Sequence, residues 1–157
     1  MVVINQKKLN QFLASDRVSF KGVEKENLRS DKDGRISNKS FPEAFGVHNF
    51  NSFVTLDYSQ PHLEIVTPTF QDNYELYGFL EGLHAYVEQN LEGDLLWNYS
   101  MPPKFKGKFI KLPPYGKSNK TKLAHLYRLG LRNRYGDKMQ STAGIHFNIS
   151  FSESVIK

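Results

Sequence analysis

Apolar and polar residues follow two different periodicities along this chain of 157 residues. From position 72 to 93 and from 118 to 136, apolar side chains recur every three or four residues, which is the spacing of one helix face. From 142 to 152 they alternate with polar residues, and from 53 to 68 they form two short runs around a turn, as in strands. The pattern predicts two long helices and several short antiparallel strands.

Both long helices have clear start and stop signals. Asp72 can cap the first helix, with Glu75 three residues later, and Ser118 can cap the second. Gly93 and Gly136 follow the last apolar positions, where glycine commonly ends a helix. The first helix is expected to bury its stripe, which consists of Tyr74, Tyr77, Leu80, Leu83, Val87 and Leu91. The stripe of the second helix consists of Leu123, Leu126, Tyr127, Leu131 and Tyr135.

The segment from 53 to 68 contains two carboxylates inside its apolar runs, Asp57 and Glu64, with a Ser-Gln-Pro turn between them. If the runs pair as an antiparallel hairpin, a register that sets residue 57 opposite residue 64 is allowed, and both side chains then leave one face. Like charges opposed on a sheet destabilise it, and a bound divalent cation would reverse that effect. The alternative is that one acid faces solvent near the turn.

A second pair of acids, Glu24 and Glu26, lies two residues apart and would share one face of a strand. Residues 31–34 have the composition of a turn, so residues 20–37 are predicted to form a hairpin. The alternative is that both glutamates are ordinary surface acids.

The remaining segments are assigned more coarsely. Residues 5–14 predict a short amphipathic helix and residues 41–51 a loop. Residues 94–117, rich in proline and glycine, predict connections with one short strand around Phe109 and Ile110.

The alternating segment at 142–152 predicts a strand with one apolar and one polar face. The apolar face consists of Ile145, Phe147, Ile149 and Phe151, and the polar face of His146, Asn148 and Ser150. The polar face points to water or to a site, and an exposed His146 is the alternative to a functional one.

Together these elements indicate an α+β fold with one antiparallel sheet and helices on its back. Four carboxylates and His146 would then lie on polar strand faces, where clustered acids can bind the Mg²⁺ used in phosphoryl transfer. A neutral imidazole nitrogen can complete such a ligand set.

Composition narrows the class of protein. The length fits a single domain over residues 1–157, and no run approaches the roughly 18 apolar residues of a membrane helix. The absence of a signal-peptide pattern predicts a cytoplasmic protein, and the absence of cysteine agrees with it. The net charge is +5, and residues 104–134 carry ten Lys or Arg and no acid, which indicates an anionic partner or a solvated basic face.

Several runs of the sequence resemble, in order and at similar spacing, the N-terminal part of bacterial glutamate-cysteine ligases (gamma-glutamylcysteine synthetases) of the proteobacterial type. The likeness covers about residues 20 to 152. The runs are Gly22-Val-Glu-Lys-Glu-Asn-Leu-Arg29, Thr55-Leu-Asp57, Leu63-Glu-Ile-Val-Thr-Pro68, Tyr115-Gly-Lys-Ser-Asn119, Leu126-Tyr-Arg128, Gly130-Leu-Arg-Asn-Arg-Tyr-Gly136, Met139-Gln140 and Gly144-Ile-His-Phe-Asn148.

The resemblance implies a glutamine-synthetase-like fold, in which a curved antiparallel sheet forms the active-site wall and helices cover its outer face. It also implies an ATP-dependent ligase: ATP phosphorylates the gamma-carboxylate of L-glutamate, and L-cysteine attacks the acyl phosphate to give gamma-glutamylcysteine, the first step of glutathione biosynthesis. Carried over by motif, the Mg²⁺ ligands are Glu24, Glu26, Asp57, Glu64 and His146. Candidate substrate-binding residues are Tyr58, Tyr127, Leu131 and Asn148, and no catalytic residue is implied beyond the metal ligands.

Members of this family are much longer than this chain, so the fold is expected to be incomplete. Their later part supplies a further metal carboxylate and most of the nucleotide pocket. The expected partners are therefore L-glutamate, L-cysteine and ATP, together with either the complementary C-terminal part or a second copy of this chain. No membrane and no nucleic acid is expected as a partner.

Two other functions are compatible with the sequence. A non-catalytic module could bind an anion or RNA through the basic 104–134 region, with strong salt dependence, although no RNA-binding motif is present. A related carboxylate-amine ligase could use a different amine.

Overall fold

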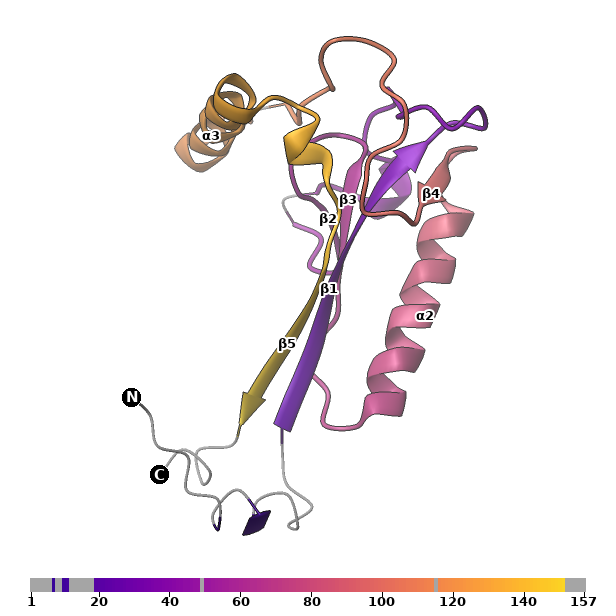
Figure 1. The fold of residues 1–157 in the computed structure, drawn as a ribbon, viewed down its shortest axis with the longest axis vertical. Coiled ribbons are helices and arrows are strands. Elements are labelled where there is room, and N and C mark those ends of the chain that lie inside the picture. The colour runs from indigo at the N-terminus through magenta and orange to yellow at the C-terminus, as the bar shows by residue number, and fades with distance from the viewer. Residues whose placement is uncertain (1–6, 8–9, 12–18, 49, 115, 152–157) are drawn as a thin grey trace.

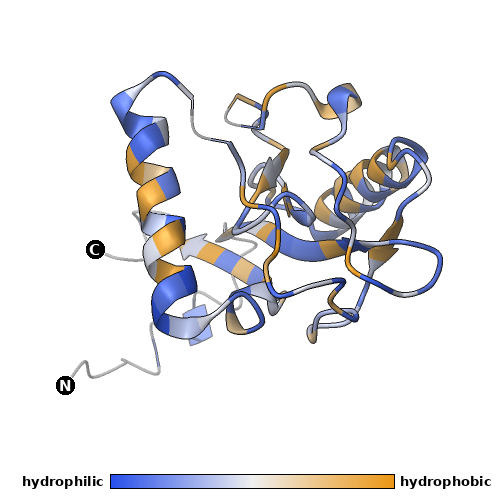
Figure 2. Ribbon diagram, turned by 90° about the horizontal axis from the view of Figure 1, so that it is seen from above, coloured by the Kyte–Doolittle hydropathy of each residue, from blue (hydrophilic) through white to orange (hydrophobic). Residues whose placement is uncertain are grey.

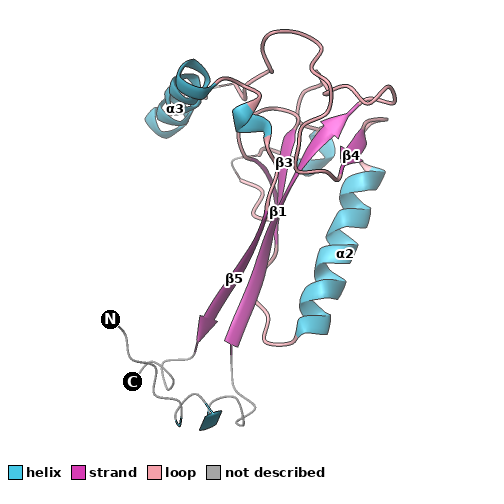
Figure 3. Ribbon diagram, in the orientation of Figure 1, coloured by secondary structure: helices cyan, strands magenta, loops and turns pink. Residues whose placement is uncertain are grey.

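A computed structural model describes residues 7, 10–11, 19–48, 50–114 and 116–151 of the chain, and most of the helix expected at 5–14 lies outside them. Five strands and two long helices form the described part (Figures 1 and 3). The elements are β1 (Ser19–Ser30), η1 (Glu43–Phe45), β2 (Val54–Leu56), β3 (His62–Val66), α2 (Asn73–Gln89), β4 (Leu95–Trp97), α3 (Asn119–Tyr135), η2 (Met139–Ser141) and β5 (Ile145–Phe151).

All strand pairs in the sheet are antiparallel, which confirms the α+β prediction. The strand order is β2-β3-β1-β4, and β5 also pairs with β1. β3 occupies one edge of β1, while β5 and β4 share the other edge along residues 19–25 and 28–30. The long β1 therefore connects every part of the open sheet.

One face of the sheet packs against α2. Its core contains Val54 and Leu56 from β2, Leu63 and Ile65 from β3, and Val87 from the helix. Figure 2 shows hydrophobic residues recurring along both long helices. A second cluster closes one end of the opposite face, and it consists of Leu28, Ile36, Tyr58, Ile110 and Leu112.

The first long helix begins as predicted, because the Asp72 carboxylate accepts hydrogen bonds from the backbone N–H groups of Tyr74 and Glu75 at 2.7 and 3.0 Å. The expectation that its whole stripe is buried is wrong at Tyr74 and Tyr77, which are 87% and 64% exposed. The row that faces the sheet contains Leu76, Leu80, Leu83 and Val87, so the two tyrosines lie beside it rather than in it.

The second long helix also has the predicted ends. The Ser118 hydroxyl accepts a hydrogen bond from the N–H of Thr121 at 3.3 Å, and Gly136 ends the helix with a positive φ of 81°. No residue of α3 is buried, and the helix stands at one end of the sheet (Figure 1). Within the described part of the chain, Leu131 of its apolar stripe packs against the second core cluster, while Leu123, Leu126, Tyr127 and Tyr135 are exposed.

Two smaller predictions need correction. The turn at 31–34 forms around the Asp31 carboxylate, and the two arms pair only over residues 29–31 and 35–37, so the expected hairpin has a short second arm. The short strand of the 94–117 segment is β4, not the region around Phe109 and Ile110. Ile110 is instead a core residue.

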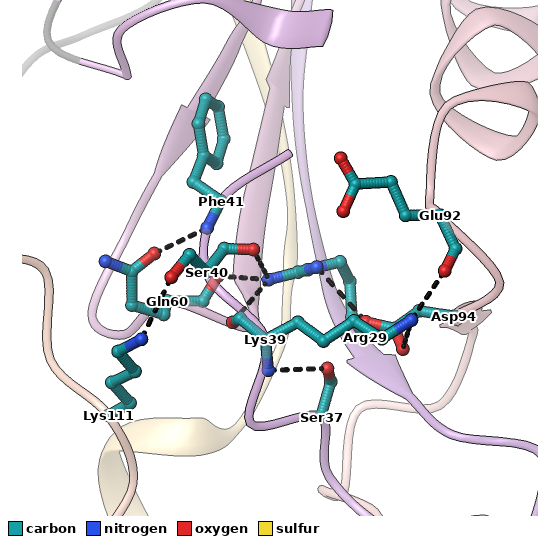
Figure 4. Close-up of polar contacts among 9 residues, drawn as sticks. All are labelled: Arg29, Ser37, Lys39, Ser40, Phe41, Gln60, Glu92, Asp94 and Lys111. Atoms are coloured by element: carbon teal, nitrogen blue, oxygen red, sulfur yellow. Dashed lines mark hydrogen bonds and ion pairs between the residues drawn. The ribbon is translucent and has the colours of Figure 1, made fainter. Parts of the chain in front are cut away.

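Arg29 of β1 is fully buried and binds three of the loops that connect the helices and strands (Figure 4). Its Nη1 lies 3.1 Å from Oδ2 of Asp94, and its Nη2 donates to the backbone oxygens of Lys39, Ser40 and Gln60 at 2.8 to 3.1 Å. Asp94 also lies 3.3 Å from the Lys39 ammonium. Nothing in the local sequence signals this network.

Among the described helices, none has the length and apolar character that crossing a membrane requires.

Candidate active site

The hairpin between β2 and β3 has a different register from the expected one. Thr55 pairs with Glu64, and the N–H of Asp57 donates to the backbone oxygen of His62 at 3.1 Å. Asp57 therefore lies opposite His62, two residues from the predicted partner, because the turn closes tightly with a hydrogen bond from the N–H of His62 to Ser59. A shift of two residues preserves the face, so Asp57 and Glu64 still project from the same side.

The other predicted metal ligands lie on this same face, which is the one opposite α2. Glu26 pairs directly with Glu64, and Glu24 pairs with Val66 on one edge and with His146 on the other. Since side chains alternate across a strand, these registers align Glu24, Glu26, Glu64 and His146 on one side. The polar face predicted for the last strand is confirmed.

β5 holds the two glutamates of β1 in place. The Glu24 carboxylate accepts a hydrogen bond from the Asn148 amide at 3.0 Å and lies 3.3 Å from Nδ1 of His146. The Glu26 carboxylate accepts a hydrogen bond from the N–H of Gly144 at 2.8 Å. Asn148 therefore belongs with the carboxylates in space.

His62 is a candidate ligand that sequence reasoning missed. It has no exposed surface, and its Nδ1 and Nε2 lie 3.5 Å from Asp57 and 3.6 Å from Glu26. These separations exceed a normal hydrogen bond, and neither nitrogen has another partner. The signal was its position two residues before Glu64, which places both on one strand face.

The electrostatics of the site follow from burial and crowding. Burial raises the pKa of Glu64, and the charges of Asp57, Glu24 and Glu26 raise it further. Burial also raises the pKa of Asp57, against the opposing influence of His62. The pKa of Glu26, in contrast, is lowered. The main cause is the neighbouring His62 imidazole, and the backbone N–H of Gly144 adds to it, while burial acts in the opposite direction.

This donor set fits a divalent cation. Glu26, Asp57 and His62 each offer a ligand atom, and these atoms lie within 4.8 Å of one another. The two ring nitrogens of His62 are buried without a hydrogen bond, and the neighbouring carboxylates repel one another. A bound cation would take one of the two ring nitrogens as a ligand, leave the other as an N–H donor toward the neighbouring carboxylate, and reduce the repulsion between the acids.

A cavity of about 320 Å³ adjoins Asp57. It brings together three of the four predicted substrate residues, Tyr58, Tyr127 and Leu131, but not Asn148. The other lining residues are Asp57, Ala124, Arg128 and Gln140. Sequence reasoning gave no role to Gln140.

Tyr58 contributes to this cavity from a fixed position. It is only 3% exposed, and its hydroxyl donates to the Asp137 carboxylate at 2.5 Å. Burial and then Asp137 raise the pKa of this tyrosine, so it stays protonated. Its hydroxyl is therefore already paired with Asp137 and is not free to bind a ligand.

Two arginines of the basic 104–134 region make hydrogen bonds within the protein. Arg128 of α3 donates to the backbone oxygen of Asp57 at 2.6 and 3.0 Å, and Arg132 donates to Asp137 and to the backbone oxygen of Ile110. These two arginines position α3 against the carboxylate hairpin, so they do not belong to a freely solvated basic face.

We expect Asp137→Asn to destabilise the chain by about 1 to 3 kcal/mol at pH 7, because a buried acceptor for charged and neutral donors is weakened. Burial alone would raise the pKa of Asp137, but Arg132, Tyr58 and the N–H of Ile110 outweigh it and lower the pKa. The stabilisation is therefore present above the unfolded pKa of about 3.9 and is lost as pH falls through the lower folded value.

Urea unfolding of the wild type and Asp137→Asn between pH 3 and 7 would measure this. The exposed Asp33→Asn is the matched control and should change little. A difference between wild type and Asp137→Asn that stays constant down to pH 3 would contradict the prediction.

Comparison with known protein families gives a clear result. The family model for glutamate-cysteine ligase matches residues 2–157. The chain belongs to the glutamate-cysteine ligase family. Similar curated relatives include the glutamate-cysteine ligase of Hahella chejuensis, 42% identical over 136 residues, and that of Wigglesworthia glossinidia brevipalpis, 39% identical over 140 residues. These alignments cover 85% and 88% of this chain.

Solved ligase structures share the fold. A glutamate-cysteine ligase from Francisella tularensis in complex with AMP matches with a TM-score of 0.83 and 32% identity over 88% of this chain. A bifunctional glutathione synthetase from Pasteurella multocida matches with a TM-score of 0.81 and 26% identity over 96% of it. The chain spans only 26 to 28% of the length of the two curated ligases and 19 to 28% of these structures.

Proposed function

We propose that this chain forms the metal-binding wall of a glutamate-cysteine ligase. The reaction is ATP-dependent ligation of L-glutamate, through its gamma-carboxyl group and an acyl phosphate, to L-cysteine, giving gamma-glutamylcysteine. The observation that carries the proposal is the gathering of Glu24, Glu26, Asp57, Glu64 and His146 on one sheet face. The AMP complex of the Francisella tularensis ligase supports a nucleotide substrate.

In this proposal those five residues would hold Mg²⁺, which would supply electrostatic stabilisation of the transferring phosphoryl group when bound. Glu26 and Glu64 face each other across β1 and β3, so their oxygens are available to a shared ion. Asn148 orients the Glu24 carboxylate through its hydrogen bond, and it is a positioning residue rather than a substrate contact. Gly144 does the same for Glu26 through its backbone N–H.

The cavity beside Asp57 is the proposed cysteine pocket. Tyr127 and Leu131 of α3 line it together with the nearly buried Tyr58. Arg128 fixes the distance between this pocket and the carboxylates by binding the backbone of Asp57. A related ligase with another amine substrate would differ at these lining residues.

We further propose that residues 1–157 form one domain, the N-terminal portion of a ligase catalytic domain, which a complementary C-terminal part completes. Two apolar surfaces support this. Ile145, Phe147 and Ile149 of β5 are 52 to 65% exposed, and Leu123 and Leu126 of α3 are 69% and 63% exposed. Apolar surfaces of this kind mark sites that another part of a protein covers. The expected localisation stays the cytoplasm.

Reconstitution tests this function. The chain would be purified alone and together with the C-terminal segment of the Hahella chejuensis ligase that follows the matched region, and assayed with ATP, Mg²⁺, glutamate and cysteine. We expect ADP and gamma-glutamylcysteine only from the combination, because the isolated chain lacks most of the relatives' length. Omitting cysteine should abolish the dipeptide.

Turnover by the isolated chain would contradict the need for a second part. A complex that forms from the two parts but produces no dipeptide would contradict the ligase function itself. Replacing cysteine by other small amines in the same assay identifies the amine substrate.

A further inference from the structure

His62 is a buried polar residue that the five-residue metal wall proposed above does not include. It has no exposed surface, and it lies on the face of β3 that carries Glu64. A neutral imidazole has one N–H donor and one acceptor nitrogen, and both nitrogens of His62 lack a hydrogen-bond partner in the structure. Burying such a group without a partner destabilises a fold. The protein atoms around His62 therefore leave a place for one more interaction.

The surroundings of His62 identify the chemistry of that missing partner. Nδ1 lies 3.5 Å from Oδ2 of Asp57, and Nε2 lies 3.6 Å from Oε2 of Glu26. Ligands about 2.1 Å from one octahedral ion lie roughly 3 to 4.2 Å from each other. The ligand atoms of Glu26, Asp57 and His62 lie within 4.8 Å of one another, so small side-chain rotations suffice to bring all three onto one ion.

We propose that His62 is a nitrogen ligand of a divalent cation held by Glu26 and Asp57, and that it shifts the preference of this site from Mg²⁺ toward first-row transition ions such as Co²⁺ and Mn²⁺. The inference rests on the proposed metal wall and adds a residue to it. Mg²⁺ selects oxygen ligands, whereas an imidazole nitrogen suits transition ions. A cation held at this position by Glu26 and Asp57 alone would meet only oxygen ligands and would lack this discrimination.

The competing explanation is that His62 is protonated and acts as the counter-charge between the two carboxylates. A protonated imidazole cannot bind a metal ion, and its positive charge repels one. The two explanations predict opposite results when His62 is replaced. Loss of a ligand weakens binding of transition ions, while loss of a competing charge strengthens binding of every divalent cation.

Titration calorimetry of the chain with Co²⁺ and, separately, with Mg²⁺ distinguishes them. The variants are His62→Leu, which removes the donor, and His62→Gln, which offers an oxygen in its place. His84→Leu is the control, because His84 lies on α2, which packs against the opposite face of the sheet. We expect His62→Leu to weaken Co²⁺ binding by about tenfold or more, since even outer partners of a metal ligand change affinity by about 10- to 100-fold.

His62→Gln should keep the Mg²⁺ affinity within about threefold of the wild type while losing the Co²⁺ preference. Pulsed EPR of the Mn²⁺-loaded chain provides a second readout. Because His146 is also a proposed ligand, nitrogen couplings should decrease in His62→Leu and persist in part in His146→Asn.

Unchanged or tighter Co²⁺ binding by His62→Leu would overturn the inference, and so would nitrogen couplings that disappear only in His146→Asn. Either result leaves the proposed ligase function standing, because dipeptide formation by the reconstituted pair tests that function separately. A wild-type chain that binds neither ion would overturn the inference together with the proposed metal wall.

Discussion

Replacing Glu64 by glutamine should lower the ligase activity of the reconstituted protein by about 100- to 1000-fold, the usual cost of removing one group that stabilises transition-state charge. Glu64 sits between Thr55 and Glu26 in the sheet, so Glu64 and Glu26 are two acids in directly paired positions. In the proposed site both carboxylates would help to hold the cation. Glutamine keeps the size of the side chain but removes the charge, and Mg²⁺ affinity should fall by about 10- to 100-fold.

The same substitution should increase the stability of the metal-free chain. Burial and the neighbouring acids raise the pKa of Glu64, which means that its charged form is disfavoured in the folded state. Removing one of two opposed like charges on a sheet stabilises it by about 0.2 to 1 kcal/mol. Activity and stability therefore change in opposite directions, as expected where a functional site is strained.

Dipeptide formation, calorimetry with Mg²⁺ and thermal unfolding without metal would measure the three effects. Glu81→Gln is the matched control, since Glu81 is an exposed glutamate of α2. An unchanged Mg²⁺ affinity in Glu64→Gln would remove Glu64 from the ligand set. A loss of stability instead of a gain would show that the carboxylate has a structural partner.

Arg29→Met should destabilise the fold by about 3 to 5 kcal/mol, because breaking a buried ion pair leaves an uncompensated charge. The variant leaves Asp94 buried beside a thioether and removes the donor from three backbone oxygens, those of Lys39, Ser40 and Gln60 (Figure 4). The Lys39 ammonium remains near Asp94, which makes the lower end of this range the expected result.

Urea unfolding with circular dichroism would measure the change. The exposed Arg35→Met serves as control and should stay within about 0.5 kcal/mol of the wild type. Adding Asp94→Asn to Arg29→Met should restore part of the loss, because the orphaned charge is removed. A loss below 1 kcal/mol in the single variant would show that water replaces Arg29 at little cost.

Sequence periodicity predicted the parts of this structure that depend on local rules. Asp72 and Ser118 cap their helices as their types and positions indicate. Alternation placed Glu24, Glu26 and His146 on one face, since a strand has a fixed period of two. The grouping of Asp57 with Glu64 survived an incorrect register because the error was two residues.

Features that depend on distant residues were not predictable in the same way. The partners of Arg29 come from three separate loops, at Lys39 and Ser40, at Gln60 and at Asp94. The exposed stripe of α3 reads as an ordinary amphipathic helix in the sequence. Periodicity identifies an apolar face, but it does not say whether the surface that covers it belongs to the same segment.

The pairing of β1 with β5 has a consequence for the order in which the chain folds. Glu24 and His146 are 122 residues apart in sequence, and Glu26 and Gly144 are 118 apart. Contacts of such sequence separation require closing a very long loop, and they form late and slowly. During synthesis on the ribosome, the acids of β1 would stay solvated and unpaired with β5 until almost all of the described chain had emerged. The carboxylate wall is therefore a late product of folding, and helix α2, with its local contacts, can form well before it.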